Sequence, residues 1–140
     1  MLHEELTERI IKIFYDVYNE VVHGYLESVY ENAMTIALEQ EGLKVERQVG
    51  LPVFFRGQSI GVFYADLIVE GLVILELKAV RSIDASHEAQ LLHYLRSTEI
   101  EVGLLLNFGV KPEMKRKIYD NPRKSLPMDE QLEDLDTILI

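Results

Sequence analysis

Residues 64–78 constrain the fold more than any other part of this sequence. Two apolar runs flank Val69-Glu70-Gly71-Leu72, a glycine-containing reversal that predicts a β-hairpin. The second run continues to Leu75 without a polar residue, which indicates a strand buried on both faces. Charge nevertheless stands near the end of each run, as Asp66 in the first and as Glu76 and Lys78 in the second. Because charges are costly to desolvate, these groups must pair, bind a metal or open into a cleft.

The spacing of these charges has a direct chemical interpretation. Glu76 and Lys78 share one face of their strand because side chains alternate with a period of two. Carboxylates at the ends of adjacent strands can hold Mg²⁺, and a neighbouring lysine can orient a water or stabilise charge on a phosphorane-like transition state. The set therefore suits metal-assisted hydrolysis of phosphodiesters. An ion pair between Lys78 and the carboxylates explains the same residues, and spacing alone leaves both possibilities open.

The length and the apolar pattern predict one domain over residues 1–125 and an acidic, apolar tail over residues 126–140. Helical periodicity predicts helices over residues 3–22 and 26–40, each followed by a glycine. Three consecutive strands are expected over residues 45–55, 58–68 and 72–79, and Pro52 favours an edge position for the first. A helix over residues 86–97 and a strand over residues 101–108, parallel to the Glu76 strand, follow. A short basic helix is expected over residues 111–119. The resulting fold class is an α/β sandwich of order α-α-β-β-β-α-β with a mixed sheet.

The charge distribution restricts the possible partners. The net charge of −10 opposes generic adhesion to nucleic acid. Residues 111–124 are the one basic stretch, so a polyanion would be expected to contact them, although a solvated helix face explains them equally well. The residues predicted to contact nucleic acid are Lys111, Lys115, Arg116 and Lys117.

The composition also bears on the compartment. The chain has no cysteine, which excludes disulfides and thiolate metal sites. Its first residues lack the pattern of a signal peptide, and no apolar run approaches the length needed to span a membrane. We therefore expect a soluble, cytoplasmic protein without a membrane partner.

Two further motifs carry polar groups on helices. Gly24-Tyr25-Leu26-Glu27-Ser28-Val29-Tyr30 places Glu27 in the first turn of the second helix, where the helix dipole favours an anion. Gln90 and Tyr94 lie four residues apart on the third helix and project together. Taken alone, the first motif is explained as well by charge complementation at a helix N-terminus together with a core tyrosine, and the second by a polar seam on a half-buried helix.

Taken together and in this order, these residues resemble the PD-(D/E)XK nuclease superfamily. Asp66, Glu76-x-Lys78 and Gln90-x-x-x-Tyr94 match its branch with a Gln-x-x-x-Tyr motif, and Gly24-x-x-Glu27-x-x-Tyr30 resembles the signature of its GxxExxY family. The strand at residues 103–109 is similar to the final core strand of that family. Ala65 stands where the superfamily name has proline.

The resemblance implies a restriction-endonuclease-like core and a role for each matching residue. Asp66 and Glu76 would be metal ligands together with the main-chain carbonyl of Leu77, and Glu27 would be an auxiliary acid and a possible ligand. Lys78 would assist the attacking water, and Gln90 and Tyr94 would line the site. The implied cofactor is Mg²⁺ or Mn²⁺.

Two functions from different classes follow. The first is a metal-dependent endo- or exonuclease acting on DNA or RNA. The alternative is a catalytically inactive binding or assembly module that keeps the nuclease fold, which the negative charge and the lack of a separate recognition domain favour. Apolar residues on more than one side of the first helix, including Tyr15 and Val22, together with the apolar tail suggest a homodimer.

Overall fold

The computed structural model describes residues 2–124 and residue 130. Its elements follow in the order α1 (Glu4–Val21), α2 (Glu27–Gln40), β1 (Val45–Phe55), β2 (Gln58–Val69), β3 (Val73–Lys78), α3 (Ala85–Arg96), β4 (Val102–Phe108), β5 (Pro112–Ile118) and α4 (Asn121–Lys124). The first seven elements agree with the predicted order to within a residue or two at each end. The predicted α/β fold class is confirmed.

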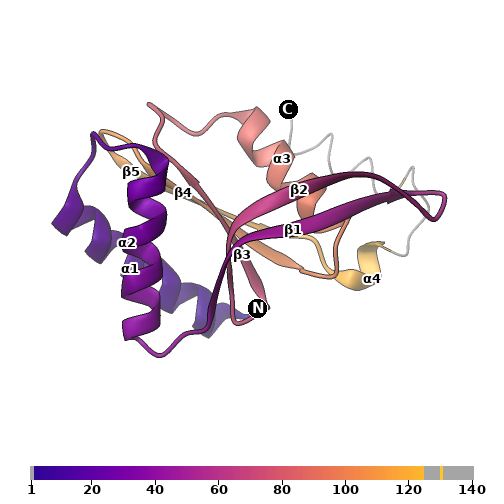
Figure 1. Cartoon of the computed structure of the whole chain (residues 1–140), viewed down its shortest axis with the longest axis horizontal. Helices are drawn as coiled ribbons and strands as arrows, with labels where there is room; N and C mark the ends of the chain where they lie inside the picture. The colour runs from indigo at the N-terminus through magenta and orange to yellow at the C-terminus, as the bar shows by residue number, and fades with distance from the viewer. Residues whose placement is uncertain (1, 125–129, 131–140) are drawn as a thin grey trace.

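The strands form one mixed sheet in the order β1-β2-β3-β4-β5. Only β3 and β4 are parallel, and the other neighbours are antiparallel. Residues 79–101, which include α3, connect the two parallel strands, as such a connection requires. β1 lies at an edge, as Pro52 indicated, and the β1–β2 hairpin extends well beyond the rest of the sheet (Figure 1).

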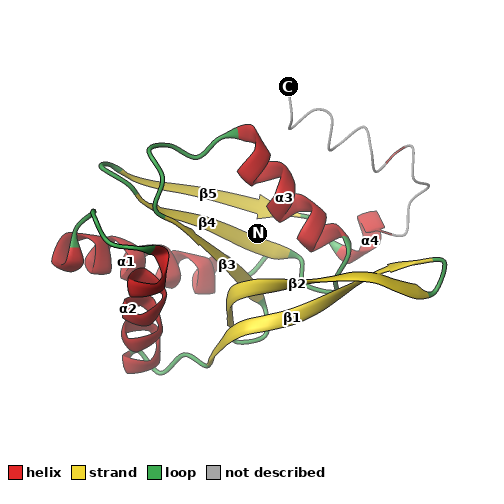
Figure 2. Ribbon diagram, turned by 45° about the horizontal axis from the view of Figure 1, so that its top comes forward, coloured by secondary structure: helices red, strands yellow, loops and turns green. Residues whose placement is uncertain are grey.

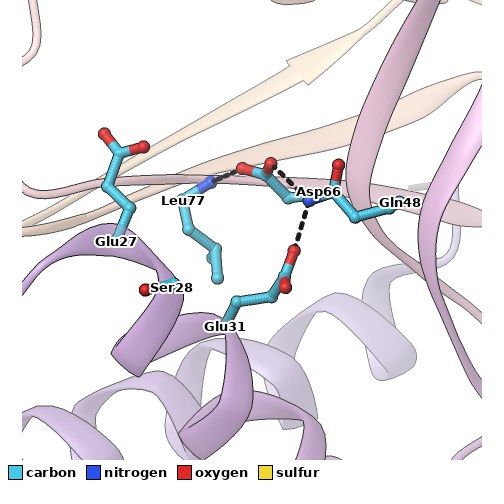
Figure 3. Close-up of a pocket in the computed structure, with 6 residues that line it drawn as sticks. All are labelled: Glu27, Ser28, Glu31, Gln48, Asp66 and Leu77. Carbon is cyan, nitrogen blue, oxygen red and sulfur yellow. Dashed lines mark hydrogen bonds between the residues drawn. The ribbon is translucent and has the colours of Figure 1, made fainter.

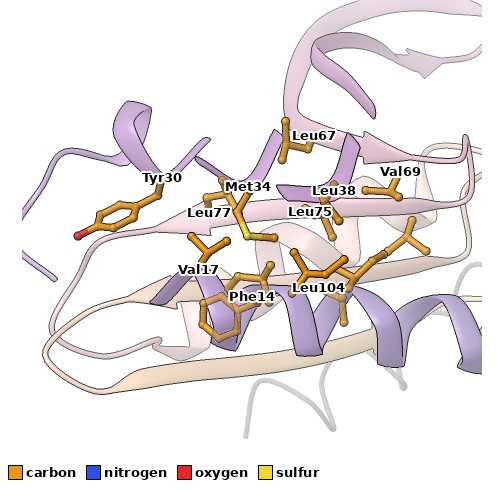
Figure 4. Packing of buried hydrophobic residues seen from close by; sticks show 14 of the residues in the cluster. Phe14, Val17, Tyr30, Met34, Leu38, Leu67, Val69, Leu75, Leu77 and Leu104 are labelled. Atoms are coloured by element: carbon orange, nitrogen blue, oxygen red, sulfur yellow. The ribbon is translucent and has the colours of Figure 1, made fainter. Parts of the chain in front are cut away.

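Helices cover both faces of the sheet. α1 and α2 lie together on one face, and α3 lies on the other (Figures 1 and 2). The larger core cluster joins α1 and α2 to the sheet through fully buried side chains such as Phe14, Met34, Leu75 and Leu104, which are packed together in Figure 4. The second cluster packs Leu91, Leu92 and Leu95 of α3 against the opposite face. Because β3 is buried from both sides, its Val73–Leu75 segment is continuously apolar.

The predicted basic helix over residues 111–119 is wrong, because this segment forms strand β5. Its apolar residues Met114 and Ile118 lie on the side of the sheet that packs against α1 and α2. Lys117, on the other side, forms a salt bridge with Glu88 of α3 at 2.6 Å. The spacing of Met114 and Ile118 fits a helix as well as alternate positions of a strand, and partnering with β4 decides in favour of the strand.

A short helix, α4, follows β5 and begins at Asn121-Pro122. Proline in the first turn of a helix lacks only an N–H that would have no intrahelical partner. The predicted tail at 126–140 lies outside the described residues except for residue 130. Over the described part of the chain, no helix is both long and apolar enough to cross a membrane.

Candidate functional site

The site begins where strands β2 and β3 separate. Their pairing includes Leu67 opposite Leu75 and goes no further in that direction. One more step in this register would place Asp66 opposite Glu76. Instead, the Asp66 carboxylate enters the fork, where its Oδ2 accepts a hydrogen bond from the main-chain N–H of Leu77 at 2.8 Å. A carboxylate thus replaces the backbone partner that β3 loses.

Glu76 lies beside Asp66 in an environment that destabilises the charged form of its carboxyl group. Its side chain is 7% exposed, and its Oε1 is buried without a hydrogen-bond partner. Burial, followed by the neighbouring negative charge of Asp66, raises the pKa of the Glu76 carboxyl to about 9. A buried carboxylate with a free oxygen next to a second carboxylate is an arrangement that a cation would stabilise.

Lys78 follows Glu76 on the same side of β3 and is half-buried. Its positive charge lowers the pKa of Glu76, although less than burial and Asp66 raise it. Within the described residues, Lys78 forms no salt bridge with Asp66 or Glu76. The interpretation of these three residues as a closed structural ion pair is therefore not supported.

The donor set at the fork fits a hard divalent cation. In an extended strand, the N–H and C=O of one residue point to the same side, so the Leu77 carbonyl faces the fork with its N–H. Two carboxylates and a carbonyl are oxygen ligands of the kind that Mg²⁺ binds, with water and phosphate in its remaining positions. No group of three His, Cys, Asp or Glu side chains suited to a metal occurs in the described part of the chain. Protein ligation would therefore rest on Asp66, Glu76 and the Leu77 carbonyl.

Glu27 reaches the same region from α2. A pocket of about 180 Å³ opens beside Asp66, and Figure 3 shows its lining residues Glu27, Ser28, Glu31, Gln48, Asp66 and Leu77. Glu27 is the first residue of α2, and the preceding Leu26 provides no side-chain cap. The helix N-terminus favours the Glu27 carboxylate electrostatically.

The Gly24-x-x-Glu27-x-x-Tyr30 pattern has a structural explanation. Gly24 adopts φ +114°, a conformation that side chains other than hydrogen disfavour. The buried hydroxyl of Tyr30 donates to the Val22 carbonyl at 2.6 Å and accepts from the Tyr25 N–H at 3.2 Å. Glycine thus permits the turn and tyrosine holds it, which fixes the point at which Glu27 enters the site.

Gln90 and Tyr94 approach from α3 on the opposite face. A side-chain hydrogen bond from Gln90 lowers the pKa of Tyr94, but burial and then the charges of Glu76 and Asp66 raise it overall. The Tyr94 ring stacks on Phe63 of β2 at a centroid distance of 3.6 Å and an interplanar angle of 6°. Tyr94 therefore lies close enough to both carboxylates for their charges to raise its pKa.

Two residues of the pocket were missed by the sequence analysis. The Gln48 amide donates to Glu31 Oε1 at 2.5 Å and to Asp66 Oδ1 at 3.4 Å (Figure 3). Gln48 has φ +48°, which is unusual for a non-glycine residue within a strand. Arg47 holds Glu31 from the other side at 3.0 Å. Glu31 could have been found because it lies one helical turn after Glu27, whereas nothing in the sequence signalled Gln48.

The predicted nucleic-acid contacts do not share one face. Strand alternation places Arg116 on the side of α1, where it donates to the Leu2 carbonyl at 2.6 Å. Lys115 and Lys117 point to the other side, where Lys117 pairs with Glu88. Lys111 precedes β5 and lines a pocket with Arg81. These four residues therefore do not form one continuous basic surface.

Comparison with known proteins agrees with this geometry. A sequence model described as the PD-(D/E)XK nuclease superfamily matches residues 4–117. The chain belongs to this superfamily. Nuclease superfamily members generally use divalent metals, which is consistent with the donor set at the fork. No curated protein matches the chain.

A solved structure shares the fold of this chain. A crystal structure of SSO0001 superimposes with a TM-score of 0.50 and 18% sequence identity, over 79% of this chain and 57% of that one. At this identity the similarity shows the fold alone. The chain corresponds to little more than half the length of that protein, so the activity of the longer protein does not transfer.

Proposed function

We propose that this chain is a Mg²⁺- or Mn²⁺-dependent nuclease that hydrolyses phosphodiester bonds in DNA or RNA. The observation that carries the proposal is the buried, unpartnered Oε1 of Glu76 beside Asp66 at the β2–β3 fork. A chain that gained nothing from this arrangement would be more stable with a neutral or apolar residue in place of Glu76. The metal, when bound, would supply Lewis-acid activation of the phosphodiester.

The residues of the chain would act as follows. Asp66, Glu76 and the Leu77 carbonyl hold the cation, and the hydrogen bond from Leu77 N–H keeps Asp66 in the fork. Lys78 lies next to the carboxylates without a salt bridge in the described structure, so its ammonium can orient the attacking water and stabilise the negative charge that develops on the phosphate. Gln90 and Tyr94 present polar groups from α3, and Glu27 and Glu31 bound the site from α2. The GxxExxY family assignment is part of this proposal, supported by the roles of Gly24 and Tyr30.

Cleavage of labelled oligonucleotides tests the proposal. The purified chain is incubated with single- and double-stranded DNA and RNA in Mg²⁺, in Mn²⁺ and in EDTA. We expect metal-dependent cleavage that Glu76→Gln and Lys78→Met abolish. Glu8→Gln, an exposed position on α1, makes the same chemical change away from the site and should retain activity.

The alternative is a catalytically inactive binding or assembly module of the same fold. It is favoured by the net charge of −10 and by the separation of the basic side chains on β5. Absence of cleavage in either metal, by a chain that retains its fold, would favour this alternative over the nuclease. Cleavage that persists equally in Glu76→Gln would indicate a contaminant and would overturn the proposed site.

A further inference from the structure

Three loops meet at the end of the sheet next to the fork. They connect α1 to α2, β3 to α3, and β4 to β5, and both ribbon views show them side by side (Figures 1 and 2). Between them lies a pocket of about 360 Å³, lined by His23, Tyr25, Ala79, Arg81 and Val110 among others. A second pocket of about 580 Å³ also contains Arg81 and Val110 and continues to Lys111.

The pocket of about 360 Å³ is flanked by the same chain segments as the pocket at the fork. Leu77 lines the pocket at the fork, and Ala79, two residues later on the same chain segment, lines the loop pocket. On the other side, Glu27 lines the pocket at the fork and Tyr25 lines the pocket of about 360 Å³. The end of β3 and the start of α2 therefore form a boundary common to both pockets.

The loops are held in place by buried polar groups. The fully buried side chain of Asn107 binds Val80 at two points, accepting from its N–H at 3.0 Å and donating to its carbonyl at 2.9 Å. The Tyr18 hydroxyl lies 2.7 Å from the carbonyl oxygens of both Gly109 and Val110, which share its single proton. Tyr30 holds the third loop through Val22 and Tyr25. A pocket whose three walls are fixed in this way is preformed, which lowers the entropic cost of binding.

The side chains at this surface suit a single nucleic-acid strand. Arg81 and Lys111 form no salt bridge and no side-chain hydrogen bond within the described residues, although acidic residues outnumber basic ones in the chain by 24 to 14. Glu113 lines the second pocket, but its Oε1 accepts from Ile83 N–H and the Asn107 amide. Tyr25 packs edge-on against Tyr30, and its side chain remains 55% exposed. Proteins that bind single-stranded nucleic acid combine positively charged side chains, which contact the phosphates, with exposed aromatic rings, on which the bases stack.

We infer that the loop pockets of Arg81, Lys111 and Tyr25 bind the single-stranded segment that flanks the scissile phosphate of the substrate. This inference rests on the proposed function and specifies the substrate path. Arg81 and Lys111 contact successive phosphates, and a base stacks on Tyr25. Binding of the nucleic-acid strand thus depends on the positively charged side chains of Arg81 and Lys111 close to the site, while the basic residues on β5 contribute little.

Equilibrium binding of a fluorescent single-stranded oligonucleotide in EDTA tests the inference, because metal-dependent cleavage is then absent. We expect Arg81→Ala and Lys111→Ala each to weaken binding about fivefold at 0.1 M salt and to reduce the salt slope by about 0.7. Tyr25→Ala should weaken binding by about tenfold through loss of stacking. Lys12→Ala is the matched control, since it removes the same charge from an exposed position on α1 that lines neither pocket.

The outcomes separate this inference from the proposed function. Equal losses in Lys12→Ala and Lys111→Ala, or unchanged binding in Arg81→Ala, would overturn the loop-pocket path even if the chain cleaves its substrate. Absence of detectable oligonucleotide binding would also overturn it. Binding that depends on Arg81 and Lys111 in a chain that never cleaves would support the path and refute the nuclease proposal. Circular dichroism of each variant verifies that the fold is retained.

Discussion

The N–H of Leu77 donates to the Asp66 carboxylate at 2.8 Å. Asp66 therefore both closes the strand fork and faces the candidate cation position. Two substitutions of Asp66 distinguish its structural role from its role as a ligand. Asp66→Asn keeps an oxygen that can accept from Leu77, whereas Asp66→Ala leaves a partly buried N–H without its partner. We expect Asp66→Ala to lower the free energy of unfolding by about 1–3 kcal/mol and Asp66→Asn to cost less.

Urea denaturation of the metal-free variants measures this difference. Both variants should lose Mn²⁺ binding in calorimetric titration, because both remove the carboxylate charge. An Asp66→Asn variant that binds Mn²⁺ like the parent would contradict the assignment of Asp66 as a ligand.

Glu76 should destabilise the metal-free protein at neutral pH. Its folded pKa of about 9 lies above the ordinary value of 4.5 for this carboxyl, so between these two pH values the folded state holds a proton that the unfolded state has released. Stability that is present below pH 4.5 is therefore lost as the pH rises toward 9. At pH 7 the penalty is up to about 3 kcal/mol. Glu76→Gln should remove most of it and raise the melting temperature in EDTA.

The same residue should make stability depend on metal. A cation that binds only the folded state raises its stability in proportion to the logarithm of metal concentration. We expect Mn²⁺ to raise the melting temperature of the parent and to leave Glu76→Gln unchanged, measured by differential scanning calorimetry. A parent protein whose stability neither falls with pH in EDTA nor rises with Mn²⁺ would contradict a cation site at the fork.

Most of the fold was predictable because its signals are local. Helical periodicity located α1 and α2, and the uninterrupted apolar run located β3 between two helical layers. β5 was misassigned because four of its seven residues are polar and its strand character comes from pairing with β4. Pairing with a neighbouring strand outweighs the weak preference of such a polar segment for helix or strand.

In the site, too, residues with a local sequence signal were predictable and residues placed by the tertiary structure were not. Asp66, Glu76 and Lys78 were identifiable because charge at the end of an apolar strand needs an explanation. Gln48 was not, since its role arises from a positive φ in β1 and from the position of α2 across the fork. Asn107 was likewise hidden, because only the tertiary structure places its amide against Val80.

Gly109 should be irreplaceable for the loop that carries Arg81. A Cβ at this position would lie 2.3 Å from the Val80 carbonyl oxygen, which is backbone held by Asn107. We expect Gly109→Ala to lower the free energy of unfolding by about 1–3 kcal/mol, as overpacking does. Gly61→Ala is a suitable control, because a Cβ there meets nothing within 4 Å. Guanidinium denaturation compares the two, and equal effects would show that the approach of these loops is not rigid.

Asp84 should make the start of α3 sensitive to acid. Its carboxylate accepts from the N–H groups of Ser86 and His87 as the N-cap of the helix. The side-chain hydrogen bond from Ser86, followed by the bond from His87 N–H, lowers the Asp84 pKa from 3.8. A lowered pKa means that the stabilisation is present above pH 3.8 and is lost as the pH falls through the lower folded value. Amide exchange at Ser86 and His87 should therefore lose protection on acidification relative to amides in α1. Asp84→Asn retains a capping oxygen that does not titrate, so its protection should not follow this local pH dependence; an identical acid response in both proteins would refute the role of Asp84.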